Sequence, residues 1–116
     1  MEKENVILHV TPGDNWDKAK TDYYYYPDSL KKEGFISCAT HEQVLRSAEF
    51  LYKDKLNQKL LYINPEKVKA QVVYEDIHEM GHSFPHIYGA LNLDAVIKVI
   101  DFKPDSSGIF ALPNIS

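Results

Sequence analysis

Apolar residues along this chain gather in short runs that are rich in β-branched side chains. Runs of this length and composition are typical of strands rather than helices. Six of them predict strands, at residues 6–11, 35–38, 60–63, 71–75, 87–91 and 95–102. The first run is interrupted only by His9 and predicts a mostly buried strand.

A short helix is predicted directly after the first strand. Thr11 has the character of an N-cap, because Pro12 then occupies the first helical position and Asp14 the third. This helix should run through Trp16 and Ala19.

Two further helices are predicted in the first half of the chain. Residues 29–34 predict one capped turn closed by Gly34. Thr40 and Gln43 have the spacing of a capping box and open the longest predicted helix. Its apolar face repeats at Val44, Ala48, Leu51 and Tyr52.

The segments between these elements predict loops. Residues 21–28 contain four consecutive tyrosines, Tyr23 to Tyr26, without a clean period, and residues 76–83 are polar and contain Gly81. The tail from Pro104 is rich in turn residues. Because the helices come early and strands dominate afterwards, we expect an α+β fold rather than a parallel βαβ array.

Length and composition limit the classes of function. A chain of 116 residues has room for one core, so we expect a single domain over residues 1–116. A formal net charge of −4 argues against a nucleic-acid partner. The lone Cys38 excludes an internal disulfide and favours a reducing compartment. No apolar run has the length of a signal peptide or membrane span, so we expect a cytoplasmic protein without membrane contact.

His9 and Glu75 are candidate functional residues on predicted strands. His9 shares a strand face with Ile7 and Thr11. It is either a hydrogen-bonded core histidine or a group that faces a ligand, since an unpaired buried imidazole is costly. Glu75 closes the fourth strand and would meet His9 only if that strand lies beside the first.

Three histidines, His78, His82 and His86, recur every four residues, as zinc ligands on one helix do. Gly81, Ser83 and Pro85 interrupt any such helix. We therefore expect no metal site.

The segment Phe84-Pro85-His86-Ile87-Tyr88-Gly89 is the most distinctive in the chain. Pro85 restricts the backbone before His86, and Gly89 frees it after Tyr88. On an extended chain, His86 and Tyr88 point to the same side. Two such amphipathic rings suit the wall of a pocket, although a packed strand with solvent-facing polar tips is the alternative.

The pattern of these residues resembles the bacterial family called domain of unknown function 952. The resemblance spans about Ile7 to Val99. It rests on Ile7-Leu8-His9-Val10-Thr11, Trp16, Ser29-Leu30, Glu33-Gly34-Phe35-Ile36, Gln43, Glu75, Phe84–Gly89 and Ala95-Val96. The family typically has Gly-Phe-Ile-His-Cys-Ser, and Ser37 here occupies the place of that histidine.

The resemblance implies an ADP-ribosyltransferase-like fold, in which two small, mostly antiparallel sheets form a cleft for NAD. In such folds a first-strand histidine binds a ribose, a place that His9 matches. An aromatic ring stacks on nicotinamide, a role open to Tyr88 or the Tyr23–Tyr26 run. A late polar group stabilises the departing oxocarbenium, and either Glu75 or His86 fits that role.

Two hypotheses follow from the resemblance. In the first, the domain binds NAD or a related nucleotide and transfers or hydrolyses ADP-ribose. Glu75 and His86 are then the catalytic candidates, and His9, Ser37 and Tyr88 line the cleft. No cofactor is required, NAD is a substrate, and the resemblance identifies no protein acceptor. In the second hypothesis, the pocket is a non-catalytic module for a small metabolite or peptide.

Overall fold

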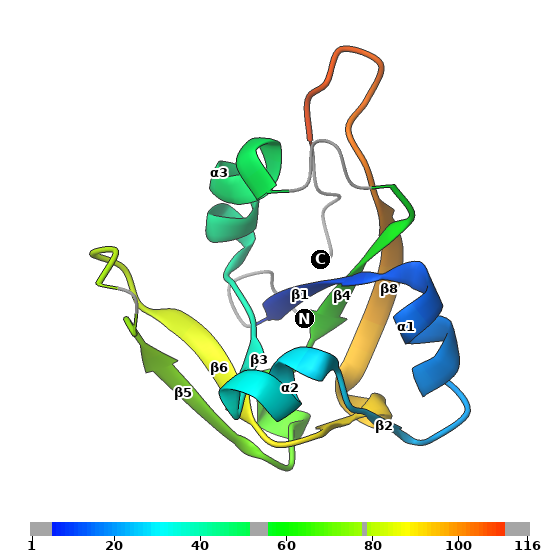
Figure 1. The fold of residues 1–116 in the computed structure, drawn as a ribbon, viewed down its shortest axis with the longest axis vertical. Coiled ribbons are helices and arrows are strands. Elements are labelled where there is room, and N and C mark those ends of the chain that lie inside the picture. Colours follow the sequence, from blue (N-terminus) through cyan, green and yellow to red (C-terminus); the bar gives the residue numbers. More distant parts are fainter. Residues whose placement is uncertain (1–5, 52–55, 78, 111–116) are drawn as a thin grey trace.

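The computed structural model describes residues 6–51, 56–77 and 79–110. It describes their side chains as well, except those of residues 47–51. The eight strands are β1 Ile7–Pro12, β2 Tyr24–Tyr25, β3 Ile36–Ser37, β4 Gln58–Ile63, β5 Gln71–Glu75, β6 Phe84–Tyr88, β7 Leu91–Asn92 and β8 Val96–Phe102. The helices are α1 Gly13–Ala19, α2 Asp28–Glu33 and α3 His41–Leu51, with 3-10 turns η2 Pro65–Lys67 and η3 Leu93–Ala95. The predicted α+β class is confirmed (Figure 1).

The strands form three antiparallel sheets and not the two that were expected. Their orders are β1-β4-β8, β2-β7 and β3-β6-β5. The unexpected sheet pairs Tyr24 with Asn92 and Tyr25 with Leu91. A two-residue strand has too few positions to show an alternation, so the sequence pattern did not reveal it.

Strands β1 and β4 are mostly buried, which explains why they are nearly continuous apolar runs, whereas β8 also carries exposed residues such as Ile97 and Lys98. Ile7 packs into one core cluster with Trp16 and Leu61. Its neighbour Leu8 points to the opposite face, into a second cluster with Tyr62 and Phe102.

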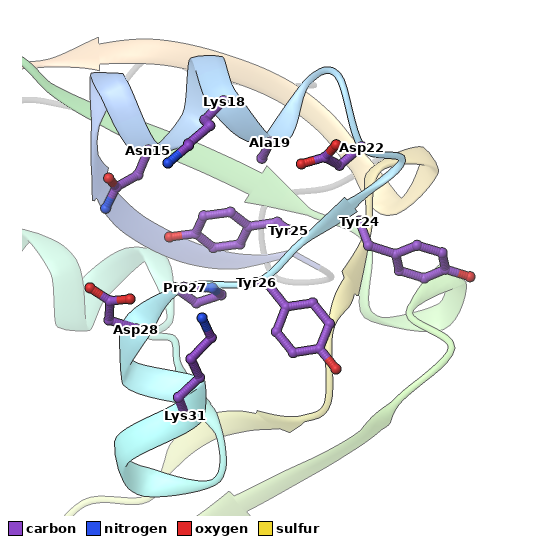
Figure 2. A pocket seen from close by; sticks show the side chains of 10 residues that line it. All are labelled: Asn15, Lys18, Ala19, Asp22, Tyr24, Tyr25, Tyr26, Pro27, Asp28 and Lys31. Atoms are coloured by element: carbon purple, nitrogen blue, oxygen red, sulfur yellow. The ribbon is translucent and has the colours of Figure 1, made fainter.

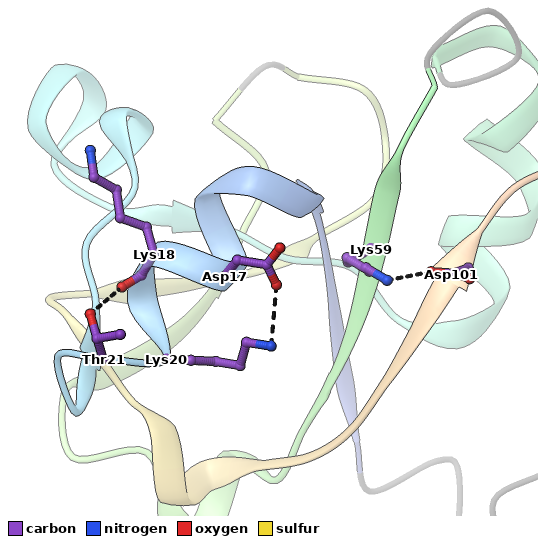
Figure 3. Close-up of polar contacts among 6 residues, drawn as sticks. All are labelled: Asp17, Lys18, Lys20, Thr21, Lys59 and Asp101. Carbon is purple, nitrogen blue, oxygen red and sulfur yellow. Dashed lines mark hydrogen bonds and ion pairs between the residues drawn. The ribbon is translucent and has the colours of Figure 1, made fainter.

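Figure 3 shows polar contacts on this sheet and on the helix α1 that follows β1. Lys59 on β4 forms an ion pair with Asp101, its register partner on β8. At the end of α1, the Thr21 hydroxyl donates to the Lys18 carbonyl at 2.9 Å.

Helix α3 begins as predicted. The Thr40 amide donates to Gln43 Oε1 at 2.9 Å, and the Gln43 amide donates to Thr40 Oγ1 at 3.2 Å. Val44 is buried as expected, whereas the side chains of Ala48, Leu51 and Tyr52 lie outside the described part of the chain.

Three local predictions need correction. Strand β1 continues through Pro12, so Pro12 and not Thr11 caps α1. The strand predicted at 87–91 instead spans Phe84–Tyr88 and ends before Gly89, whose φ of 158° turns the chain. Tyr25, expected in a loop, is 2% exposed and belongs to the core.

Within the described residues, no helix is both long enough and apolar enough to cross a membrane.

The turn from α2 into β3 depends on Gly34. It ends α2 in the left-handed conformation with φ of 86°, and beyond its adjoining residues no heavy atom of the described chain lies within 4 Å of an added Cβ. Gly34→Ala should therefore lower the free energy of unfolding through backbone strain alone, by about 1 kcal/mol.

Urea denaturation measures this loss, and Gly34→Asn is the matched control because asparagine tolerates the left-handed region. Gly34→Ala with wild-type stability would contradict the assignment of strain to this turn.

Candidate functional site

Strands β1 and β3 belong to different sheets and meet at a single bridge. Leu8 and Ala39 exchange two backbone hydrogen bonds, each of 2.8 Å. Two residues further along β1 the strands have parted, and Val10 and Ser37 line a pocket of about 370 Å³. The other lining residues come from β1, α1, the tyrosine segment and α2: His9, Thr11, Pro12, Asn15, Tyr25, Pro27, Asp28, Ser29 and Glu33.

Backbone polar groups of both strands face this gap. Because Leu8 bonds away from β4, alternation along β1 also turns the N–H and C=O of Val10 away from β4. The Cys38 amide donates to the Pro85 carbonyl at 2.9 Å, so Cys38 bonds to β6 and its neighbour Ser37 faces the other way. The pocket therefore lies between two strand edges that do not pair with each other.

His9 closes the inner end of the gap. Its Nδ1 lies 2.7 Å from the Ser37 carbonyl oxygen, and its Nε2 lies 2.9 Å from the Tyr25 hydroxyl. A carbonyl oxygen only accepts, so Nδ1 carries the proton. The same Tyr25 hydroxyl is 2.7 Å from Thr11 Oγ1.

The protonation state of His9 sets the direction of this chain of hydrogen bonds. Burial lowers the pKa of His9 below its ordinary value, and the hydrogen bond to Ser37 opposes that effect. In the neutral ring, Nε2 is an acceptor for Tyr25, whose one proton is then not available to Thr11. The Thr11 hydroxyl can instead donate its own proton to the Tyr25 oxygen. Burial also raises the pKa of Tyr25 to about 12, so the phenol stays protonated.

A second polar cluster lies on the sheet β3-β6-β5. His86 Nδ1 lies 2.8 Å from Glu75 Oε2, and the Tyr88 hydroxyl donates to the same oxygen. Phe35 stacks on the His86 ring with centroids 4.1 Å apart and an interplanar angle of 17°. The His86 residue is 3% exposed, whereas 39% of Tyr88 is exposed.

Hydrogen bonds from Tyr88 and then from His86 lower the pKa of the Glu75 carboxyl, which holds it as a carboxylate. The bond to Glu75 in turn raises the pKa of Tyr88. An anionic acceptor next to an imidazole N–H fixes the His86 tautomer with Nδ1 protonated. The cluster can therefore present Nε2 as a proton acceptor.

The structure separates the predicted site residues into two groups that meet at Ser37. Glu75 lies beside His86 and Tyr88 rather than His9, because β5 pairs with β6 and not with β1. Ser37 is the register partner of His86, and its carbonyl accepts from His9.

Sequence reasoning missed the roles of Tyr25, Thr11 and Phe35. The tyrosine run hid the one buried ring among three exposed ones. The common strand face of His9 and Thr11 was visible, but their shared partner Tyr25 comes from a distant segment. Among the described residues no group of three or more potential ligands can hold a metal ion, and His78 lies outside them.

The model of the family described as "Protein of unknown function (DUF952)" matches residues 10–99. The X-ray crystal structure of protein CC0527 from Caulobacter crescentus aligns with a TM-score of 0.79 at 24% identity, over 91% of this chain and 93% of that one. The solution NMR structure of CC0527 aligns with a TM-score of 0.70 at 24% identity, over 90% of each chain. These likenesses show a shared fold. No match is found among curated proteins.

The neutral, buried His9 makes stability depend on pH. Its folded pKa lies below its ordinary value of 6.5, so the unfolded chain binds the proton more readily. The neutral His9 makes its full contribution to the free energy of unfolding at pH values above 6.5, and this contribution is lost as the pH falls through that value. Urea unfolding at pH 7.5 and 5.5 should therefore show lower stability at the lower pH.

His9→Gln isolates this contribution, and His82→Gln, at an exposed site, is its control. The His9 variant should lose part of the pH dependence, and the His82 variant should keep it. An unchanged pH dependence in His9→Gln would show that His9 is not the linked group.

Proposed function

The chain belongs to the family described as "Protein of unknown function (DUF952)", and for this member we propose that the pocket between β1 and β3 binds NAD or a related nucleotide. The observation that carries the proposal is the pair of strand edges at Val10 and Ser37. The Ser37 carbonyl accepts from the His9 ring, and the other backbone polar groups of these two residues face one pocket without bonding to each other. A carboxamide, as on nicotinamide, has one acceptor and a two-proton donor that complement such an edge.

The charges around the pocket also suit this ligand. Asp28 and Glu33 line it, and among the residues that the structure describes no lysine or arginine does. The nicotinamide ring of NAD is cationic, so these carboxylates favour it over a neutral ring.

An adjoining pocket of about 250 Å³ is lined by two lysines, Lys18 and Lys31, and by two aspartates, Asp22 and Asp28 (Figure 2). It shares Asn15, Tyr25, Pro27 and Asp28 with the first pocket and adds Lys18 and Lys31. Figure 2 shows the two lysines on α1 and α2, with Tyr25 between them. A nucleotide with its nicotinamide end beside Ser37 would extend its phosphates toward these lysines.

Chemistry on the bound nucleotide would be the transfer or hydrolysis of ADP-ribose. The bond between the ribose C1′ and the nicotinamide nitrogen breaks, the ring leaves with the electron pair, and the acceptor oxygen bonds to C1′. In this proposal Glu75 supplies the carboxylate that offsets the positive charge developing on the ribose. His86 Nε2 takes the proton of the acceptor.

A second candidate function is a non-catalytic module for a small metabolite or peptide. Ser37, in the place of the histidine that relatives typically carry, favours it, because the departure removes an imidazole that could transfer a proton at this site. The same strand edges would also pair with an extended peptide by adding a strand.

Isothermal titration with NAD, ADP-ribose and nicotinamide mononucleotide tests binding. NAD and the mononucleotide should bind at millimolar concentration or better, since both carry the nicotinamide end. Ser29→Trp places an indole in the pocket and should weaken binding by about tenfold or more, which is 1.4 kcal/mol. Ser107→Trp, at an exposed distant loop, is the matched control.

Absence of binding by all three ligands, or equal binding by the Ser29 and Ser107 variants, would overturn the proposal. Ser37→His then separates the two candidate functions. A gain of NAD hydrolysis would favour an enzyme that has lost its histidine, and binding without hydrolysis would favour the module.

A further inference from the structure

His86 occupies the middle strand of its sheet, between a carboxylate on one neighbouring strand and a hydroxyl on the other. Glu75 lies on β5 and Ser37 on β3, and both strands pair with β6. The order across the sheet is thus serine, histidine, glutamate. All three residues belong to the predicted nucleotide site, but their arrangement supports a different reaction.

The strand register brings the side chains of Ser37 and His86 close together. The two residues are direct partners, and the backbone bond from Cys38 to Pro85 makes them a non-hydrogen-bonded pair. In such pairs the Cβ atoms are only about 4.5–5.5 Å apart and on the same face. Ser37 is exposed, and its hydroxyl makes no hydrogen bond within the described part of the chain.

The imidazole of His86 is held in the orientation that a general base needs. Its Nδ1 donates to Glu75 at 2.8 Å, and Phe35 packs on its face. The Tyr88 hydroxyl holds the carboxylate in place. Nε2 is then the free acceptor, and it makes no hydrogen bond within residues 6–51, 56–77 and 79–110.

We propose that Ser37 is a nucleophile for acyl transfer from small carboxylic esters, with His86 as its general base and Glu75 as the positioning residue. This activity goes beyond nucleotide binding and does not depend on it. A site for acyl transfer is defined by three parts: a nucleophile, a base close to it, and a third group that orients the base. Rotation of the Ser37 hydroxyl toward Nε2 completes the arrangement, as catalytic hydrogen bonds are often open without substrate.

The reaction balances with water as the second substrate. The Ser37 oxygen bonds to the acyl carbon, its proton passes to His86 Nε2, and the alcohol leaves with that proton after the ester C–O bond breaks. Water then attacks the acyl-serine, gives a proton to Nε2, and the carboxylic acid leaves as the proton returns to Ser37.

The neighbouring pocket supplies space and a donor for this reaction. Ser37 lines the pocket of about 370 Å³, which has room for a small acyl or alcohol group. The Ser37 amide faces away from β6 and toward the pocket, where a backbone N–H stabilises an oxyanion. His9 fixes the peptide carbonyl of the same residue at 2.7 Å.

Labelling with a fluorophosphonate and hydrolysis of p-nitrophenyl acetate test the proposal in the full chain. The probe should modify the peptide that contains Ser37, and ester hydrolysis should show an initial burst. Ser37→Ala should abolish the label and lower hydrolysis by about a hundredfold or more. Ser83→Ala, which removes another exposed hydroxyl, should change neither.

Labelling that persists in Ser37→Ala, or a wild-type protein that takes no label, would overturn the proposal. Glu75→Gln and Tyr88→Phe test the orienting role. Glu75→Gln should slow labelling strongly, whereas Tyr88→Phe retains the bond between Glu75 and His86 and should slow it less. A Glu75 that only stabilises the fold would lower the melting temperature and leave the labelling rate of the folded protein unchanged.

Discussion

The hydrogen bond from His9 to the Ser37 carbonyl is the contact on which the architecture of both candidate sites depends. It joins two sheets at the point where strand pairing between them ends, just beyond the bridge from Leu8 to Ala39. A neutral imidazole held by Tyr25 at its other nitrogen can span that gap and leave the backbone beyond it unpaired. Without this contact, the Ser37 carbonyl would lack a partner or would form a backbone hydrogen bond with β1, since backbone polar groups away from water need partners.

Ser37 belongs to both sites because the backbone groups and the side chain of a strand residue point in different directions. Its backbone faces β1 and the pocket, whereas its side chain lies beside His86 on the face of the sheet. A histidine at this position would place a second imidazole beside the first. The serine instead leaves a small hydroxyl opposite His86, which Glu75 orients.

Much of the fold was predictable because its signals are local. The apolar runs marked β1, β4 and β8, and the capping box marked α3. Alternation along an extended chain predicted that His86 and Tyr88 share a side, and both contact Glu75. The identity of the partners was not predictable, because it depends on which distant strands pair. Glu75 meets His86 through the pairing of β5 with β6. Thr11 was mistaken for a helix cap because its hydroxyl forms a hydrogen bond with Tyr25, which is fourteen residues away in sequence.

Amide chemical shifts can show whether the edges of β1 and β3 form a ligand-binding gap. Titration of the ¹⁵N-labelled protein with nicotinamide mononucleotide reports on each backbone N–H. We expect saturable shifts that are largest at the amides of Val10 and Ser37, with the amide of Ile97, on the exposed side of β8, unchanged. If Val10 and Ser37 do not shift while other amides respond, the ligand does not bind in this gap.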